Sequence, residues 1–221
     1  MGSMLSPQTE RRLSLAVIAA GTAAFVALLL IAPPFFPSFD EWKYFGIGNN
    51  IWAGKGINTV FGGIFLLHGP LWPALVTGPH ALFGIDSASW GRLLNGIAGA
   101  GIVALAGWFG WRVRPAVGAI AAVTMVASLY LFDQTRTARL DIPAAALCLL
   151  FIAVGLEAVR RGSTRWAIAA GVVFVLGFLV KEINLPFLPV PFFAGLARRV
   201  PPRRSRAPGS SPLAPCRRRE S

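Results

Sequence analysis

The chain has 221 residues, of which 55% are hydrophobic and only 14% charged, and its mean hydropathy is +0.61. A soluble domain usually carries roughly 25% charged residues, so this composition excludes an ordinary soluble protein. Apolar runs of about 20 residues, the length that crosses the hydrocarbon core of a bilayer, recur along the sequence. They are continuous, whereas the strands of an outer-membrane barrel alternate over about 10 residues. We therefore expect an all-α, polytopic bundle of transmembrane helices.

The formal net charge of +12 is unevenly distributed. Residues 198–221 contain eight Arg and one Glu, so this tail contributes +7 and the rest of the chain +5. Basic residues of membrane proteins meet anionic headgroups and set topology; no nucleic-acid-binding module is visible, so we expect no nucleic acid partner. The tail has no periodicity, which predicts disorder. From its abrupt change in composition we expect that the natural protein continues differently here, through truncation or a frameshift.

Six apolar segments are candidates for membrane spans. They cover residues 13–32, 93–111, 116–132, 142–159, 166–180 and 185–197, of which the last is the least regular. The first is longer than the 7–15-residue apolar core of a signal peptide. Residues 1–12 are therefore expected to be a cytoplasmic N-terminus, followed by one transmembrane domain over residues 13–197 with about six spans.

A first outer loop of residues 37–90 separates the first two spans. Residues 40–52 can form a short helix that stops at Gly54. Residues 70–84 form an apolar run that contains three prolines. This run is short for a span, so we expect a helix that lies along the membrane or re-enters it, with a short span as the alternative.

The charges support this topology. If residues 70–84 do not cross the membrane, seven arginines outside the tail fall on the cytoplasmic side, as the positive-inside rule requires. They are Arg11, Arg12, Arg112, Arg114, Arg160, Arg161 and Arg165. The acids predicted on the outer side are Asp40, Glu41, Asp86, Asp133, Asp141 and Glu182. Six Lys and Arg residues also lie there, so the charge bias alone is modest.

Asp40 and Glu41 are adjacent acids just beyond the first span, beside Trp42 and Tyr44. Aromatic side chains anchor a chain at the membrane interface. A carboxylate held there can act as a general base towards an acceptor hydroxyl or amine, although two solvated acids in a loop are an equally simple interpretation. Asp40 and Glu41 are the candidate catalytic residues, and Tyr44 is a candidate for substrate binding.

A second set of charges lies at the ends of later spans. Asp141 begins a span, where it either caps the helix or lines a site. Arg136 and Arg139 in the preceding connector either bind a phosphate or pair with nearby acids. Lys181, next to Glu182, either meets a lipid-linked phosphate or is a snorkelling lysine with an adjacent acid. These residues are candidates for substrate binding.

His68 is the candidate metal ligand. A lone histidine is usually structural, but one on the same face as several carboxylates can bind a divalent metal or contact a phosphate. If the protein uses a cofactor, we expect it to be a divalent metal.

Several short motifs occur in an order that resembles a known enzyme family. They are Asp40-Glu41-Trp42-Lys43-Tyr44, Ala53-Gly54-Lys55-Gly56, His68-Gly69-Pro70-Leu71-Trp72-Pro73, Leu82-Phe83-Gly84, Arg92-Leu93-Leu94-Asn95, Arg139-Leu140-Asp141-Ile142-Pro143 and Gly177-Phe178-Leu179-Val180-Lys181-Glu182. Over residues 13–197 this order is similar to the N-terminal half of the GT-C fold glycosyltransferases that use polyprenyl-phosphate sugars. The dolichyl-phosphate-mannose protein mannosyltransferases and the bacterial aminoarabinose transferases of lipid A are the groups it resembles.

The resemblance implies a bundle of transmembrane helices with juxtamembrane helices in a long first outer loop. It implies that Asp40 is the catalytic base with Glu41 beside it. It further implies that Asp141 lines the same cavity, that His68 contacts metal or phosphate, and that Lys181 lies near the lipid phosphate. The function expected from it is inverting transfer of a sugar from a polyprenyl-phosphate donor to an acceptor glycan, lipid or protein. This transfer would occur on the outer face of the plasma (inner) membrane.

Two other functions stay open from the sequence. The family's later spans and soluble C-terminal domain are missing from this chain, which suits a non-catalytic fragment or a scaffold. A transporter would place charges at mid-bilayer depth and break its helices there, whereas the charges of this chain lie at the ends of its predicted spans.

Overall fold

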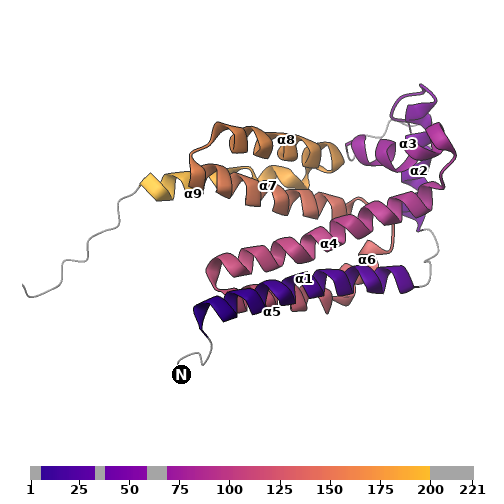
Figure 1. The fold of residues 1–221 in the computed structure, drawn as a ribbon. Coiled ribbons are helices and arrows are strands. Elements are labelled where there is room, and N and C mark those ends of the chain that lie inside the picture. Colours follow the sequence, from indigo (N-terminus) through magenta and orange to yellow (C-terminus); the bar gives the residue numbers. More distant parts are fainter. Residues whose placement is uncertain (1–5, 33–37, 59–68, 200–221) are drawn as a thin grey trace, which may run out of the picture.

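The computed structural model describes residues 6–32, 38–58 and 69–199. The regular elements in those ranges are helices, which confirms the expected all-α class (Figure 1). They are α1 (Pro7–Ile31), α2 (Phe39–Trp52), α3 (Leu71–Phe83), α4 (Ser87–Val113), α5 (Pro115–Val126), α6 (Leu129–Thr135), α7 (Asp141–Arg161), α8 (Thr164–Val180), the 3-10 helix η1 (Glu182–Phe187) and α9 (Pro189–Arg199).

Fewer helices than expected are long enough to cross a membrane. Within the described ranges, α1, α4 and α7 have the required length and hydropathy, and a fourth span results if α5 and α6 are counted together. The predicted number of about six is therefore too high. The last candidate, residues 185–197, is divided between η1 and α9, because Pro186 and Pro189 interrupt the α-helical hydrogen-bond pattern.

The predicted span 116–132 is bent in its middle. The axes of α5 and α6 differ by 58°, across a break at Ala127 and Ser128. Ser128 caps α6, since its hydroxyl accepts a hydrogen bond from the Leu131 N–H at 3.2 Å. A serine that can satisfy a free amide lets a new helix begin in a different direction.

α4 lies at the centre of the bundle. It packs against α1 and α5 on one side and against α7 on the other, with α8 covering α7 (Figure 1). α4 and α5 approach closely where they meet, because a Cβ atom on Gly118 would lie 2.6 Å from the Gly107 carbonyl oxygen. The buried apolar side chains of this part of the bundle are Phe25, Ile102, Val103, Ala122, Leu131 and Ile142.

α2 and α3 form a small cap beyond one end of the long helices (Figure 1). They pack together at Gly48, where any side chain would collide with Thr77 and the Pro73 carbonyl. α3 has 13 residues, which extend only about 20 Å at 1.5 Å per residue. As predicted, the apolar run after residue 70 therefore forms a helix too short to span, and it lies against α2 rather than within the bundle.

The helix directions divide the charges between two ends of the bundle. The start of α1, the α4–α5 turn and the α7–α8 turn lie together at one end, and each carries arginines predicted to share a side (Figure 1). We call this the arginine end. α2, α3, the start of α4, the start of α7 and the end of α8 lie at the other end, which holds the candidate site.

Candidate active site

Glu41 joins α2 to the connector between α6 and α7. Its side chain is fully buried, and its Oε1 accepts a hydrogen bond from the Ala138 N–H at 2.7 Å. Its Oε2 accepts from the Ser38 N–H at 2.5 Å, while the Ser38 hydroxyl accepts from the Glu41 N–H, so the two residues form a capping box at the start of α2. Arg92 lies 3.9 Å from Oε1 and compensates the buried charge. Both carboxylate oxygens of Glu41 are thus occupied in holding backbone.

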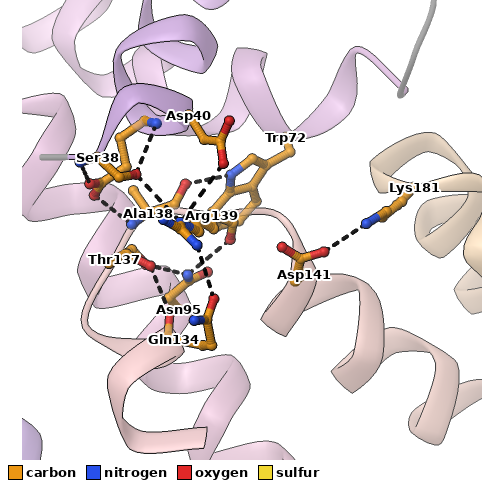
Figure 2. Close-up of polar contacts among 11 residues, drawn as sticks. Ser38, Asp40, Trp72, Asn95, Gln134, Thr137, Ala138, Arg139, Asp141 and Lys181 are labelled. Atoms are coloured by element: carbon orange, nitrogen blue, oxygen red, sulfur yellow. Dashed lines mark hydrogen bonds and ion pairs between the residues drawn. The ribbon is translucent and has the colours of Figure 1, made fainter. Parts of the chain in front are cut away.

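Two further side chains hold the same connector (Figure 2). The Trp72 indole N–H donates to the Ala138 carbonyl oxygen at 2.9 Å. The Asn95 amide donates to the Arg139 carbonyl oxygen at 2.9 Å and also to the Thr137 carbonyl oxygen. Trp72 and Asn95 are buried, so these bonds are sheltered from water and fix the backbone strongly. The connector is fastened by side chains from α2, α3 and α4.

This fastened connector places Arg139 beside Asp40 (Figure 2). The Arg139 Nε lies 4.0 Å from Asp40 Oδ2 and 3.4 Å from the Ser38 hydroxyl, and its Nη1 lies 3.5 Å from Gln134 Oε1. The Asp40 side chain is 49% exposed, in contrast to the buried Glu41 one residue later. Asp40 is therefore a solvent-accessible carboxylate held beside a cation.

Asp141 and Lys181 form an ion pair next to this group (Figure 2). The Lys181 Nζ donates to Asp141 Oδ1 at 2.7 Å, which joins the first turn of α7 to the end of α8. Asp141 does not cap α7, because Leu140 occupies the cap position and makes no side-chain cap bond. Asp141 and Lys181, which were predicted to share one face, are thus in direct contact.

The Tyr44 phenol has a raised pKa because of burial and of the charges around it. Tyr44 is buried on α2, and burial raises the pKa of its phenol, which the negative charges of Asp40 and Asp141 raise further and Arg139 lowers. The phenol therefore stays protonated over a wide pH range. Charges from α2, the connector and α7 thus act on this one hydroxyl group.

The other predicted site residues are placed differently. The Arg136 guanidinium lies 5.5 Å from the centre of the Phe132 ring, in a cation–π contact. His68 lies outside the described residues. Within the described ranges, no group of three His, Cys, Asp or Glu side chains could hold a metal ion. The predicted metal site thus has no ligand set in the part of the chain that the structure describes.

The residues that hold the connector between α6 and α7 were not predicted from the sequence. Ser38, Trp72 and Asn95 hold the connector, yet the resemblance assigned them no role. One signal was present, since Asn95 is a polar side chain within an apolar run, and such a residue must find hydrogen-bond partners when it is buried. Nothing in the sequence distinguishes the buried Glu41 from the exposed Asp40.

Comparison with protein families gives one match. Residues 67–204, well over half of the chain, match the family described as dolichyl-phosphate-mannose-protein mannosyltransferase. The chain belongs to this mannosyltransferase family. No curated protein and no solved structure matches the chain. Membership makes it a membrane glycosyltransferase of the GT-C type and confirms the resemblance found in the sequence.

The mannosyltransferase family match covers only part of the site. It includes α3, α4, the connector and α8, and so Trp72, Asn95, Arg139, Asp141 and Lys181. α1 and α2, with Asp40 and Glu41, precede the matched residues. The role of the two acids therefore depends on the geometry of this chain.

Proposed function

We propose that this chain transfers a sugar from a polyprenyl-phosphate donor to an acceptor, with Asp40 as the general base. The observation that carries the proposal is the exposed Asp40 carboxylate beside Arg139, on a connector fastened from three helices. A general base must be accessible to its substrate and held in position. Asp40 has both properties, whereas the oxygens of Glu41 are already bonded to backbone.

The reaction requires one proton transfer at the acceptor. The acceptor oxygen attacks the anomeric carbon of the sugar, its proton passes to Asp40, and the bond between that carbon and the phosphate oxygen breaks. The leaving group is polyprenyl phosphate, which is stable as an anion and needs no strong acid. Attack opposite the phosphate inverts the anomeric configuration.

Lys181 and Arg139 are the cations proposed to bind the donor phosphate. Both are partly exposed, with side chains 21% and 32% accessible, and a phosphate is a stronger partner for them than a half-exposed carboxylate. In this scheme Asp141 holds Lys181 in place until the donor arrives. The charges of Asp40, Asp141 and Arg139 also act on the Tyr44 phenol. We propose that Tyr44 contributes to substrate binding.

Glu41 takes a positioning role in this proposal. It was expected to share the catalytic role with Asp40, but it is buried and bonded to the Ser38 and Ala138 amides. By fastening α2 to the connector, it sets the distance between Asp40 and Arg139. A divalent metal near His68 stays a proposal, and no step of the scheme passes through it.

The transporter alternative has little support in the geometry. The break between α5 and α6 is the kind of feature that transporters place at a substrate site. Residues 115–132 contain no Asp, Glu, Lys, Arg or His, however. The first acid of α6, Asp133, lies more than one helical turn beyond Ser128, so the break itself offers no charged group to bind or release an ion.

For localisation we propose the plasma membrane, with the N-terminus and the arginine end in the cytoplasm. The positive-inside rule supports this orientation. Cysteine replacements test it in intact cells. A membrane-impermeant maleimide should label Lys55→Cys, next to α2, and should not label Arg165→Cys, at the start of α8; the reverse pattern would place Asp40 inside the cell.

The function is tested with purified protein and a polyprenyl-phosphate sugar, beginning with the mannose donor that the family description names. Donor binding and release of polyprenyl phosphate are both measured, because release can be followed for any acceptor supplied in a membrane extract. We expect Asp40→Asn to bind donor normally and to release product about 10²–10⁴-fold more slowly. We expect Lys181→Met to weaken donor binding about tenfold.

Two results would contradict the proposal. Unchanged release by Asp40→Asn would remove Asp40 from the reaction. Absence of donor binding by the unmodified chain would favour the non-catalytic scaffold.

A further inference from the structure

The arginine end contains a second buried glutamate that belongs to no part of the candidate active site. Glu157, near the end of α7, is 8% exposed. Its Oε2 accepts from the Arg160 Nε at 2.9 Å and from the Arg161 Nε at 3.0 Å, and its Oε1 pairs with Arg112 from α4. One carboxylate thus gathers three guanidinium groups from two helices.

The single carboxylate neither neutralises the charge of these arginines nor accepts from all of their N–H donors. Three guanidinium groups and one carboxylate leave a formal surplus of two positive charges. Each guanidinium has five N–H donors, and Glu157 has only two acceptor oxygens. The side chains of Arg112, Arg160 and Arg161 are 33%, 46% and 50% exposed. The cluster can therefore receive an anion without losing its internal ion pairs.

An apolar cavity opens beside this cluster. It has a volume of about 570 Å³ and lies among α1, α4, α7 and the start of α8. Its walls are mostly apolar, and Glu157 and Arg161 are its charged members. Its lining includes Leu15, Ile18, Ala104, Leu105 and Val154. The volume falls within the range of about 300–1,000 Å³ that is usual for ligand sites.

Tryptophans line the boundary between the cavity and the arginines. Arg112 lies 4.8 Å from the Trp108 ring centre, and Arg161 lies 4.8 Å from the Trp166 ring centre. Trp108 and Trp166 also belong to the cavity lining, so their rings lie between its apolar walls and the guanidinium groups of the cluster.

We propose that this site binds one anionic phospholipid from the leaflet at the arginine end. The lipid phosphate contacts Arg160 and Arg161, and one acyl chain enters the apolar cavity. The positive surplus charge calls for an anionic ligand, and two further observations point to a lipid rather than to a free anion. The cavity walls are apolar, and Trp rings lie at the junction, as they do where proteins meet headgroups. The site is at the opposite end of the bundle from Asp40, so this inference does not depend on the proposed transferase activity.

Native mass spectrometry of the purified chain tests the proposal. Phosphatidylglycerol and phosphatidylcholine with identical acyl chains are the probes, and free glycerol 3-phosphate is the competitor without chains. We expect one bound phosphatidylglycerol at concentrations where phosphatidylcholine binds at least tenfold more weakly. Glycerol 3-phosphate should not displace it. Equal binding of the two lipids, or displacement by the free anion, would overturn the proposal.

Matched variants locate the site. Arg161→Gln leaves Glu157 paired with Arg112 and Arg160, and it should weaken phosphatidylglycerol binding about tenfold. Arg165→Gln removes the same charge from an exposed position at the same end but outside the cavity lining, and it should change binding less than twofold. An equal loss in both variants would mean that only the general surface charge attracts the lipid.

A third variant separates the acyl chain from the charge. Ala104→Phe fills part of the cavity and keeps every arginine. It should reduce binding at least tenfold if a chain enters the cavity, and unchanged binding would contradict that placement. Circular dichroism and elution volume establish that each variant is folded before its lipid binding is compared.

Discussion

Each end of the bundle contains a buried glutamate, and the two differ in what surrounds them. Glu41 accepts hydrogen bonds from two backbone amides, one in its own helix cap and one 97 residues away, with Arg92 at 3.9 Å. Glu157 is paired with three arginine side chains and with no remote backbone group that the structure describes. The first arrangement fixes the course of the chain, whereas the second holds three partly exposed cations together.

This difference determines which charged groups at each end can still interact with a substrate or ligand. At the Glu41 end the buried acid is fully used, and the free group is its exposed neighbour Asp40. At the Glu157 end the acid is also used, but the arginines around it outnumber it. One end therefore offers a carboxylate that can take a proton, and the other offers cations that can bind an anion.

Glu41→Gln should have the largest effect on stability. Glutamine keeps the shape of the side chain but replaces one acceptor oxygen with an NH2 group, so one buried N–H loses its acceptor. Leaving such a group unsatisfied costs about 2–3 kcal/mol. Thermal unfolding in detergent measures the loss. Asp40→Asn makes the same chemical change one residue earlier and should cost less than about 0.5 kcal/mol. Equal losses would remove the distinction between the two acids.

Asn95→Ala should be the next most destabilising substitution. It removes two donors from the Thr137 and Arg139 carbonyl groups in a buried place, which costs about 2 kcal/mol. The connector should also become more exposed to hydrogen exchange, because its backbone loses its support. Asn49→Ala, on the exposed side of α2, is the matched control and should leave both unfolding and exchange unchanged. Faster exchange in both variants would show that Asn95 does not hold the connector.

Glu157→Gln should lower the free energy of unfolding by about 1 kcal/mol, less than the two substitutions above, because the arginines that lose their partner are partly exposed and can be hydrated. Its effect should depend on salt. Repulsion among the three unpaired cations is screened at 0.5 M salt, so the loss should shrink there. The loss in Glu41→Gln should respond less to salt, since it comes mainly from a buried hydrogen bond and only one cation, Arg92, loses a charge partner. Unfolding at low and high salt measures both, and an identical salt response would contradict the contrast between the two ends.

Asp86→Ala should have the smallest effect on the free energy of unfolding, and the size of this effect should depend on pH. The Asp86 carboxylate accepts the Ser89 N–H at 2.7 Å and caps α4, and this bond lowers its pKa from 3.8. A carboxyl group with a lowered pKa stabilises the fold above its unfolded pKa, and that contribution is lost as the pH falls through the folded value. Asp86→Ala should cost about 1 kcal/mol or less at pH 7. The difference from the unmodified chain should decrease towards about pH 2, and a constant difference would show that the cap is not electrostatic.

The sequence predicted much of the architecture because the relevant signals are local. Apolar runs predict helices, and the short proline-containing run after residue 70 predicts a helix that does not span. The shared face of Asp141 and Lys181 followed from counting crossings. The number of spans was overestimated for three reasons. α8, on the predicted span 166–180, has only 17 residues; Pro186 interrupts the predicted span 185–197; and the predicted span 116–132 is bent at Ser128.

The roles of Asp40 and Glu41 could not be separated from the sequence. Neighbouring residues on a helix point about 100° apart, so one can be buried while the other is exposed. Which of them is buried depends on the contact between α2 and Ala138, 97 residues later. That contact is tertiary, and no local pattern reports it.

The central claim is that Asp40 acts on the substrate while Glu41 holds the connector between α6 and α7 against α2. It is tested most directly by comparing Asp40→Asn and Glu41→Gln in the same two measurements, polyprenyl phosphate release and thermal unfolding. We predict that Asp40→Asn loses release about 10²–10⁴-fold with no change in unfolding temperature, and that Glu41→Gln unfolds about 5–10 °C lower. Normal release by Asp40→Asn, or an unchanged unfolding temperature for Glu41→Gln, would contradict the claim.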